Sequence, residues 1–513
     1  MEIKQSIPPI LRPERVKPVS FTDLVGHFQL GNSSGDAQLT GVSMNTADIR
    51  PGDLFVGLPG LKTHGANYIA KAKELGAVAF LTDSTGREIV GETDLPIATI
   101  ENARARLGEV AAYVYGNTPG NMPLLFATTG TNGKTSTSYL LEGILRQLGR
   151  VTGLSSTAER HLAGEVIVSR LTTPESTEMH ALIARMREKG VTDIAIEVSA
   201  QALTQLRVDG FLFDVAGFTN LTHDHFDDYD GFEDYLKAKA KLFTKAKALR
   251  GVVCLDTDYG QRIVELSEIP VTTITSKRDV AADWRVTVTN ELPGRTEFTL
   301  TDPAGHELKS SVPLLGAHMA LDAGLAIAMI VTAGYSFQEI AAKIESGIEA
   351  YLPGRTELVS PENSPNVYVD FGHSPDAFAK TLAAVRKVTK GKVLMLFGAD
   401  GDRDATKRPD MAKVAAAGCD ILVITDHHPR FEDPASIRKT LVDEARAFRP
   451  ELEIYEVSPP EAAIRAAVKL VKPGDAILWA GPGHQDYRDI QGVRTPYSAR
   501  AEARAALKEE GYS

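Results

Sequence analysis

The sequence predicts an α/β protein that is built from three domains. The chain has 513 residues, and domains of about 100–200 residues divide that length into about three. Short apolar segments alternate with helical patterns, which is typical of parallel sheets covered by helices. A segment dense in turn residues, 115–123, and a turn at 351–355 mark the two boundaries. We therefore expect a small N-terminal α/β domain at 1–120, a central parallel-sheet domain at 121–352 and a C-terminal domain at 353–513.

Each domain has its own series of expected elements. In the first domain, the patterns predict a strand at 53–58, a helix at 68–76 that ends at a glycine, and a strand at 77–82. In the second, they predict strands at 124–129, 194–198 and 215–219, helices at 139–148 and 320–333, and an antiparallel insert at 284–300. In the third, they predict an open α/β arrangement with strands at 367–370, 393–397, 421–425 and 476–480.

Composition and charge limit the classes of function. The formal net charge is −11 and the pI is about 5.6, which argues against nucleic-acid binding. The two cysteines, Cys254 and Cys419, lie far apart, which indicates a reducing compartment and no disulfide framework. No stretch of about 18 apolar residues predicts a membrane span, and no signal peptide is evident. These features predict a cytoplasmic enzyme without membrane insertion.

The strongest chemical signal is a glycine-rich loop that follows the strand expected at 124–129 and precedes a helix. Glycines let backbone N–H groups wrap a phosphate, and the helix presents its positive end. Lys134 would meet the β- and γ-phosphates of ATP, and the Thr135 hydroxyl would ligate Mg²⁺. The strict P-loop pattern needs a glycine where this chain has Thr128, so the loop is a variant; an ordinary glycine turn is the alternative. The residues expected to bind ATP are Gly130, Thr131, Asn132, Gly133, Lys134, Thr135 and Ser136.

Two further segments of the central domain suggest metal binding. Glu197 ends a buried apolar strand, where an unpaired carboxylate is costly, so it is a candidate Mg²⁺ ligand; a capping or salt-bridged glutamate is the alternative. A cluster of histidines and aspartates at 223–227 follows another strand and could hold a second cation or form a solvated loop. By pattern alone, Lys237, Lys239 and Lys241 predict a solvated helix face.

Three motifs of the third domain follow expected strands, and each one alone is also compatible with ordinary turn chemistry. Asp400-Gly-Asp-Arg-Asp contains Arg403, which together with Arg408 could grip carboxylates by paired hydrogen bonds. The other two motifs occupy residues 425–430 and 481–486. Two adjacent histidines, His427 and His428, have no third ligand at a regular spacing, so a zinc site is not favoured.

Together these motifs resemble those of the Mur ligases, and within that family the members that add the third residue of the peptidoglycan stem peptide. The resemblance covers nearly the whole chain from about Leu39. It is carried by Gly130-Thr-Asn-Gly-Lys-Thr, Glu197-Val-Ser, Phe218-Thr-Asn-Leu-Thr-x-Asp-His, Pro353-Gly-Arg, Asp370-Phe-Gly-His-Ser-Pro-Asp and Gly401-Asp-Arg-Asp-x-x-Lys-Arg-Pro. It implies an N-terminal UDP-sugar domain, a central ATPase domain and a Rossmann-like C-terminal domain for the incoming amino acid.

The resemblance also implies roles for single residues. It makes Lys239 a lysine carbamylated by CO₂, because the family has such a lysine fourteen residues after the histidine that matches His225. Lys134, Lys239 and His225 would then be catalytic, and Thr135, Glu197, His225 and Lys239 would hold Mg²⁺. The residues expected to bind the UDP-muramoyl-dipeptide are Thr46, Thr172, Thr173, Ser199, Gln205 and Arg207. Those expected to bind the amino acid are Arg403, His428, Arg430, Gly481 and Gln485.

The chemistry implied is amide ligation. A substrate carboxylate attacks the γ-phosphate of ATP to give an acyl phosphate and ADP, and the amine of the amino acid then displaces phosphate. Domain closure would exclude water from the acyl phosphate.

The sequence departs from the family pattern in three places. Near Thr46 the family often has Asp-Ser-Arg, so the uridine contacts differ. Met319 and Asp322 stand where the family has two spaced asparagines, so nucleotide contacts there are not transferred. His428 and Gln485 stand where members that add meso-diaminopimelate have asparagine and glutamate. Because that glutamate would meet the distal ammonium, we expect L-lysine or L-ornithine, with meso-diaminopimelate next.

Two other functions are compatible with parts of the sequence. A folylpolyglutamate synthase shares the ATPase core and the acyl-phosphate route, but Thr172-Thr-Pro and the motif at 401–404 argue against it. A non-catalytic nucleotide-binding partner would not need Lys134, Glu197 and Lys239 to be intact. We therefore expect an ATP-dependent acid–amino-acid ligase of peptidoglycan synthesis that acts as a monomer on small molecules.

Overall fold

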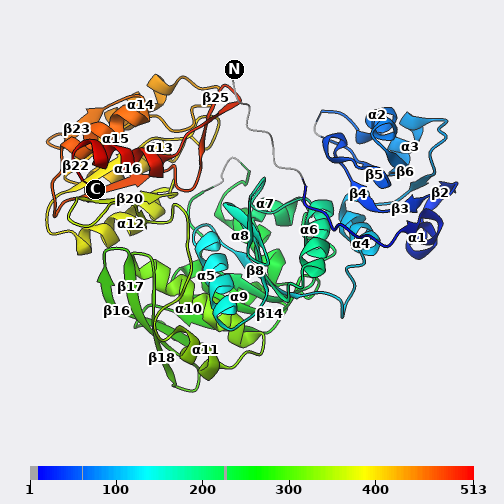
Figure 1. Cartoon of the computed structure of the whole chain (residues 1–513), viewed down its shortest axis with the longest axis horizontal. Coiled ribbons are helices and arrows are strands. Elements are labelled where there is room, and N and C mark those ends of the chain that lie inside the picture. The colour runs from blue at the N-terminus through cyan, green and yellow to red at the C-terminus, as the bar shows by residue number, and fades with distance from the viewer. Residues whose placement is uncertain (1–9, 61, 225–227, 513) are drawn as a thin grey trace.

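The computed structural model describes residues 10–60, 62–224 and 228–512. Its elements form three α/β units, each with a sheet of its own, and they follow one another along the chain from blue to red (Figure 1). The predicted fold class of three α/β domains is thereby confirmed. The residue boundaries predicted at 120/121 and 352/353 stay predictions.

The N-terminal unit has a five-stranded sheet in the order β2-β7-β6-β5-β4. Strands β4 to β7 are parallel, and β2 pairs antiparallel with β7 at the edge. The strands are β2 (Gly31–Ser34), β4 (Gly41–Ser43), β5 (Asp53–Gly57), β6 (Ala77–Thr82) and β7 (Ile97–Thr99), with β1 (Val19–Ser20) pairing β3 (Gln38–Leu39) nearby. The helices are α1 (Phe21–Phe28), α2 (Ile69–Glu74), α3 (Ser84–Val90) and α4 (Ala103–Tyr115), with 3₁₀ turns η1 (Thr46–Asp48) and η2 (Gly65–Tyr68).

The central unit has an eleven-stranded sheet in the order β11-β10-β9-β12-β8-β13-β14-β15-β16-β17-β18. The middle of the sheet is parallel and consists of β9, β12, β8, β13, β14, β15 and β16. At one end β10 and β11 continue it as antiparallel strands, and at the other end β17 and β18 do so. The strands are β8 (Leu124–Thr129), β9 (Thr152–Ser155), β10 (Glu159–Leu162), β11 (Glu165–Val168), β12 (Asp193–Glu197), β13 (Phe213–Phe218), β14 (Ala248–Cys254), β15 (Val271–Thr275), β16 (Trp284–Leu292), β17 (Arg295–Thr301) and β18 (Glu307–Val312). The predicted antiparallel insert is the β16–β17 hairpin.

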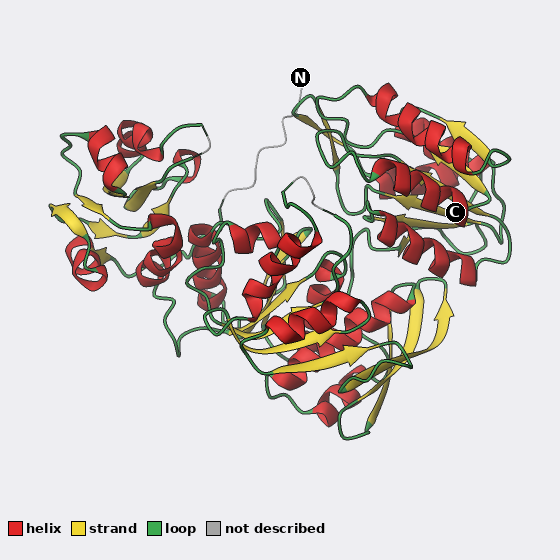
Figure 2. Ribbon diagram, turned by 180° about the vertical axis from the view of Figure 1, so that it is seen from behind, coloured by secondary structure: helices red, strands yellow, loops and turns green. Residues whose placement is uncertain are grey.

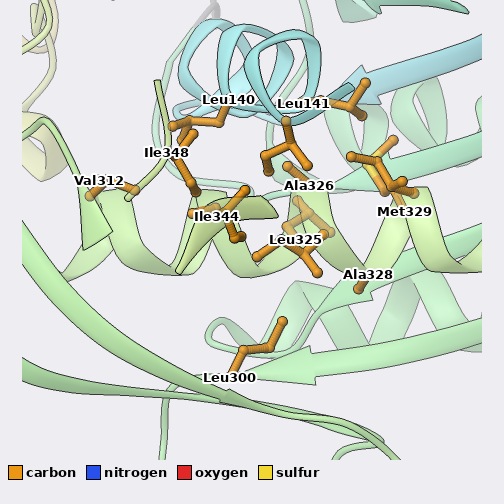
Figure 3. Packing of buried hydrophobic residues seen from close by; sticks show 14 of the residues in the cluster. Leu140, Leu141, Leu300, Val312, Leu325, Ala326, Ala328, Met329, Ile344 and Ile348 are labelled. Atoms are coloured by element: carbon orange, nitrogen blue, oxygen red, sulfur yellow. The ribbon is translucent and has the colours of Figure 1, made fainter. Parts of the chain in front are cut away.

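Helices cover both faces of the central sheet (Figure 2). One face packs against α5 (Lys134–Gln147), α10 (Ala317–Thr332) and α11 (Phe337–Ile344). Figure 3 shows Leu140 and Leu141 of α5 beside Leu325 and Ala326 of α10 in this core. The other face packs against α6 (Ser176–Glu188), α7 (Ala200–Thr204), α8 (Phe232–Ala240) and α9 (Asp258–Leu266), and η3 (Lys241–Phe243) follows α8. Burial of apolar surface on both faces holds the parallel strands in place.

Helix α5 begins at Lys134, five residues before the predicted start at Tyr139. Its first turn contains Thr135, Ser136 and other hydroxyl residues, so the apolar periodicity that signals a helix starts only at Tyr139. The helix begins directly after the glycine loop because Gly133 has φ 87°, which ends the loop in a left-handed conformation.

The C-terminal unit has a six-stranded sheet in the order β19-β20-β24-β21-β22-β23, parallel except for β19. The strands are β19 (Glu357–Leu358), β20 (Asn366–Asp370), β21 (Val393–Phe397), β22 (Ile421–Ile424), β23 (Glu453–Glu456) and β24 (Ala476–Ala480). The helices are α12 (Pro375–Val388), α13 (Arg408–Gly418), α14 (Pro434–Phe448), α15 (Pro460–Lys469) and α16 (Ala499–Glu509). A hairpin of β25 (Tyr487–Ile490) and β26 (Val493–Pro496) lies beside the loop after β22, where Arg430 bridges to Ile490.

None of the helices in the described part of the chain has the length and apolar character needed to cross a bilayer.

Candidate active site

A cavity of about 520 Å³ lies between the central and C-terminal units. It collects most of the residues that the sequence singled out, although they are spread over more than 350 positions of the chain. The predicted site residues among its walls are Thr131, Asn132, Gly133, Lys134, Thr135, Ser136, Thr172, Thr173, Glu197, Ser199, Gln205, Arg207, Lys239, Arg403, Arg430, Gly481 and Gln485. Thr46, Gly130 and His428 do not line it, and His225 lies outside the described residues.

The glycine loop is held in shape by the strand next to it. β13 pairs with β8 in parallel, so the residues after β13 lie against the loop after β8. Asn220 accepts the N–H of Thr131 with its carbonyl oxygen and the N–H of Asn132 with its side chain, at 2.9 and 3.0 Å. A Cβ on Gly133 would lie 2.6 Å from a carboxylate oxygen of Asp322, so no larger residue fits there.

Two lysines converge on one carbonyl oxygen of the loop. Nζ of Lys134 donates to the carbonyl oxygens of Gly130 and Thr131, at 2.9 and 2.8 Å. Nζ of Lys239, whose residue is 1% exposed, donates to the same oxygen of Gly130 at 2.7 Å. Burial lowers the pKa of both amines, and repulsion from Lys134 lowers the pKa of Lys239 further. The solvated helix face predicted from the pattern is wrong for Lys239, because it lies one turn after Tyr235 and Leu236 on the buried side of α8.

Glu197, a candidate metal ligand, lies beside this loop. Glu197 is 0% exposed, and in the sheet it lies opposite Thr128 because β12 and β8 are neighbours. Its carboxylate accepts hydrogen bonds from the backbone N–H and the hydroxyl of Thr157, at 2.9 and 3.0 Å. Since each carboxylate oxygen accepts more than one bond, these oxygens keep capacity for a cation. Oxygen donors of this kind suit Mg²⁺, so the residues present fit that ion.

The C-terminal unit makes two side-chain contacts with the glycine loop and a further one with the segment after β13. Nη2 of Arg355 donates to the Thr135 hydroxyl at 2.9 Å, and its guanidinium lies over the ring of Phe371. The Asn132 amide donates to a carboxylate oxygen of Asp376 at 3.1 Å. A third contact joins Lys407 Nζ to Asp224 Oδ1 at 3.0 Å. These contacts hold the C-terminal unit against the glycine loop and against the segment after β13.

The residues expected to bind the UDP-substrate form a network on the other side of the cavity. The Thr173 hydroxyl donates to the carbonyl oxygen of Glu197 at 2.8 Å and accepts the N–H of Ser199 at 3.0 Å. Arg207 donates to the side-chain oxygen of Gln205 at 2.6 Å. Thr46 lies on η1 of the N-terminal unit, outside the cavity; the same turn is tied to the central unit by an ion pair of Asp48 with Arg170 at 2.9 Å.

The residues expected to bind the amino acid lie at the ends of β21, β22 and β24. Arg430 donates to the carbonyl oxygen of Gly401 at 3.0 Å, and Gln485 lies 2.8 Å from His428 Nε2. His428 does not line the cavity itself but contacts two residues that do, Gln485 and His427. Arg408, which the sequence offered as a carboxylate grip, binds the carboxylate of Glu432 in the same chain through two nitrogens, both at 2.9 Å.

Comparison with known proteins identifies the family. Three family models match: "Mur ligase family, catalytic domain" over residues 38–115, "Mur ligase middle domain" over 128–330 and "Mur ligase, glutamate ligase domain" over 354–483. A curated relative from Leifsonia xyli, named UDP-N-acetylmuramyl-tripeptide synthetase, is 53% identical over 510 residues, which cover 98% of this chain and 99% of the relative.

The chain belongs to the Mur ligase family.

A second relative, from Streptomyces avermitilis, is 40% identical over 97% of this Mur ligase and 98% of its own length, and it is named UDP-N-acetylmuramoyl-L-alanyl-D-glutamate--2,6-diaminopimelate ligase. A solved structure with the same name has a TM-score of 0.66 at 24% identity and covers 97% of this chain and 100% of its own, which supports the three-domain fold. Mur ligases are ATP-dependent peptide ligases, so the predicted family and class of enzyme are confirmed.

Arg355 and Asp322 are ionisable residues of the cavity wall to which the sequence assigned no role. Arg355 belongs to a motif that the sequence did single out, and its contact with Thr135 places it beside the phosphate loop. Asp322 packs against Gly133, although 189 positions separate them, so only the fold could reveal the contact. Both residues lie in the cavity wall that contains the loop.

Asp322 gives a testable pH dependence. Burial raises the pKa of its carboxyl group to about 8, from a value near 3.8 in the unfolded chain. Between those values the unfolded state releases the proton while the folded state keeps it, so stability falls as the pH rises. We expect the melting temperature of the wild type to fall between pH 5 and 8 relative to that of Asp322→Asn, measured by calorimetry in the same buffers. Parallel curves for the two proteins would contradict this.

Proposed function

We propose that this Mur ligase joins L-lysine or L-ornithine, with meso-diaminopimelate as the next candidate, to UDP-N-acetylmuramoyl-L-alanyl-D-glutamate in peptidoglycan synthesis. The observation that carries the proposal is the single cavity, which combines a phosphate loop with arginines from the loops after β21 and β22. An enzyme that activates a carboxylate with ATP and then delivers an amine to it needs both groups in one space. The names of the two relatives support the UDP-linked substrate, and the second name supports meso-diaminopimelate as a candidate amino acid.

The chain's own residues suggest how the first step is assisted. A carboxylate oxygen of the UDP-substrate would attack the γ-phosphorus of ATP while the bond to the β-phosphate oxygen breaks and ADP leaves. Lys134 and Arg355 lie where their charges would stabilise the transferred phosphoryl group. Mg²⁺, when bound, would neutralise further phosphate charge, and Thr135, Glu197, His225 and carbamylated Lys239 would hold it.

The second step needs a neutral amine. The amine nitrogen attacks the acyl carbon, the bond to the phosphate oxygen breaks, and the nitrogen loses a proton. Arg403 and Arg430, which both line the cavity, would hold the carboxylate of the amino acid in this arrangement. The contacts of Arg355, Asp376 and Lys407 with the central unit would help to exclude water from the acyl phosphate.

Carbamylation of Lys239 is also a proposal, and the environment of the amine supports it. CO₂ reacts with the unprotonated amine, and both burial and the nearby Lys134 lower the pKa of Lys239. The reaction replaces a potential cation with an anionic carbamate and releases a proton. A carbamate there would no longer repel Lys134, and its oxygens would join the carboxylate of Glu197 as ligands for Mg²⁺.

The surroundings of Arg430 support a preference among amino acids. Arg430 already donates to the carbonyl oxygen of Gly401 and lies 3.7 Å from Asp400, so its charge is partly compensated. A second carboxylate, as in meso-diaminopimelate, therefore meets a weaker cation than an isolated arginine would provide. This favours a diamino acid with one carboxylate.

A ligase assay tests the proposal. The purified protein is incubated with ATP, MgCl₂, the UDP-muramoyl-dipeptide and one amino acid at a time, and the product is identified by mass. We expect faster product formation with L-lysine or L-ornithine than with meso-diaminopimelate. Turnover with meso-diaminopimelate alone would contradict the amino-acid preference, and no product with any of the three would contradict the proposed function. The cytoplasmic location and the monomeric state stay predictions.

A further inference from the structure

A carboxylate and two imidazoles meet at the end of the cavity where the amino acid would bind. The inference drawn from them rests on the proposed function. Asp400 follows β21, and His427 and His428 follow the neighbouring β22, so the fold brings together groups that the sequence left apart. One ligand atom of each lies within 4.8 Å of those of the other two. Asp400 and His427 line the cavity directly.

The hydrogen bonds of His428 determine its protonation. The backbone N–H of Asp489 can only donate, and it points at Nδ1 of His428 at 3.0 Å. Nδ1 must therefore be the unprotonated nitrogen, and in a neutral ring the proton is on Nε2. Burial, which lowers the pKa of His428, favours the same neutral form. His428 is therefore a hydrogen-bond donor through Nε2.

This protonation state fixes the orientation of Gln485. Nε2–H of His428 needs an acceptor, and the oxygen Oε1 of Gln485 lies 2.8 Å away. The amide nitrogen of Gln485 is then the atom left for the cavity, and it can only donate. An ammonium group also only donates, so Gln485 is unsuited to binding the side-chain ammonium of an amino acid.

Asp400, unlike the amide nitrogen of Gln485, can accept hydrogen bonds from an ammonium group. Its Oδ1 is a buried atom that lies 3.6 Å from His427 Nε2 and has no hydrogen-bond partner among the described residues. Its Oδ2 lies 3.7 Å from Arg430 Nη2, and the side chain is 24% exposed. Burial lowers the pKa of His427 to about 3, so that ring is neutral and does not compensate the carboxylate. A carboxylate in this state is stabilised by an added cation.

A second carboxylate in the same loop is less suited to this task. Asp404 also lines the cavity, and its Oδ2 likewise has no hydrogen-bond partner among the described residues. Its side chain is only 5% exposed, however, and its Oδ1 accepts hydrogen bonds from the backbone N–H and the hydroxyl of Thr406. Asp400 is therefore both the more open and the less satisfied of the two.

We propose that Asp400 accepts the side-chain ammonium of the incoming amino acid and thereby selects diamino acids. The selection does not depend on a second carboxylate in the substrate. A metal ion bound by Asp400, His427 and His428 is the competing use of the cluster. It would require His428 to give up either the hydrogen bond from Asp489 or the one to Gln485, since both ring nitrogens are engaged.

The test compares Asp400→Asn with the wild type on substrates that differ by the ammonium. Asparagine keeps the shape and removes the charge, so we expect kcat/KM for L-lysine and L-ornithine to fall about 10- to 100-fold. For L-norleucine, which lacks the side-chain ammonium, kcat/KM is expected to stay within about twofold, as is KM for ATP. Asp402→Asn is the matched control, because its side chain lies in the same loop and accepts the N–H of Phe431 at 3.0 Å, which an amide oxygen can also do.

Binding measurements separate this proposal from the proposed function. Calorimetry with L-lysine, L-ornithine and L-norleucine, on protein holding a non-hydrolysable ATP analogue, needs no ligation. If the wild type binds the diamino acids, Asp400→Asn does not, and no ligation product forms, the ammonium site stands and the function fails. If ligation proceeds and Asp400→Asn discriminates against L-norleucine as strongly as the wild type, the ammonium site is overturned and the function stands. Binding of no diamino acid to the wild type would also overturn the ammonium site.

Discussion

Replacing Lys134 with alanine is expected to lower kcat/KM for ATP-dependent ligation about 1,000-fold. The amine of Lys134 donates hydrogen bonds to the carbonyl oxygens of Gly130 and Thr131, so it is already positioned at the loop that would hold the phosphates. Removing it leaves the charge of the transferred phosphoryl group with one fewer partner in a site where burial strengthens electrostatic interactions. The measurement is the rate of phosphate release and of product formation.

The control for Lys134 is Lys241→Ala. Lys241 carries the same charge, lies at the exposed start of η3 and has no role in the proposed chemistry. We expect that variant to keep wild-type activity. Full ligase activity in Lys134→Ala would show that the loop does not act as a phosphate site in this enzyme.

Replacing Lys239 with alanine is expected to lower kcat about 100- to 1,000-fold, because it removes the proposed carbamate and one Mg²⁺ ligand. Acetate or formate should restore part of the activity, since a small carboxylate can enter the space that the side chain leaves. Lys237→Ala, at an exposed position of the same helix, should have wild-type activity. Wild-type kcat in Lys239→Ala would contradict the proposal.

The carbamate itself is expected to depend on pH in one direction. It forms from the neutral amine, and the lowered pKa of Lys239 keeps the amine neutral at pH values where an exposed lysine is protonated. Lowering the pH through that pKa protonates the amine and removes the carbamate. Carbon-13 NMR with labelled bicarbonate should show a carbamate signal that disappears on acidification and is absent from Lys239→Ala. The absence of this signal in the wild type would contradict carbamylation.

Strand positions were predictable from the sequence because buried parallel strands are short, continuous apolar segments. This is why β8, β12, β21 and β24 lie where they were expected. The loop between β8 and α5 was predictable for a related reason, since glycines and a lysine at one strand end form a local signal. The start of α5 was not predictable, because its first turn is made of hydroxyl residues that bury against the loop.

Contacts between positions far apart in the sequence could not be predicted from the sequence alone. Asp322 and Gly133 touch across 189 positions, and Arg355 meets Thr135 across 220. The position of Asp400 beside His427 and Arg430 depends on where β21 and β22 end relative to each other, which is a property of the sheet. The immediate neighbours of Lys239 in the sequence suggested a solvated helix face. Only the resemblance to a family indicated a role for this lysine inside the site.

The central claim is that the phosphate loop activates a carboxylate of the UDP-substrate. Oxygen-18 labelling of that carboxylate tests it most directly, with ATP, MgCl₂ and the preferred amino acid present. An acyl phosphate transfers one labelled oxygen to phosphate, because the carboxylate oxygen becomes the bridging atom and leaves with phosphorus. We predict one oxygen-18 atom in each phosphate released during ligation. Unlabelled phosphate, with the peptide product still formed, would contradict the claim.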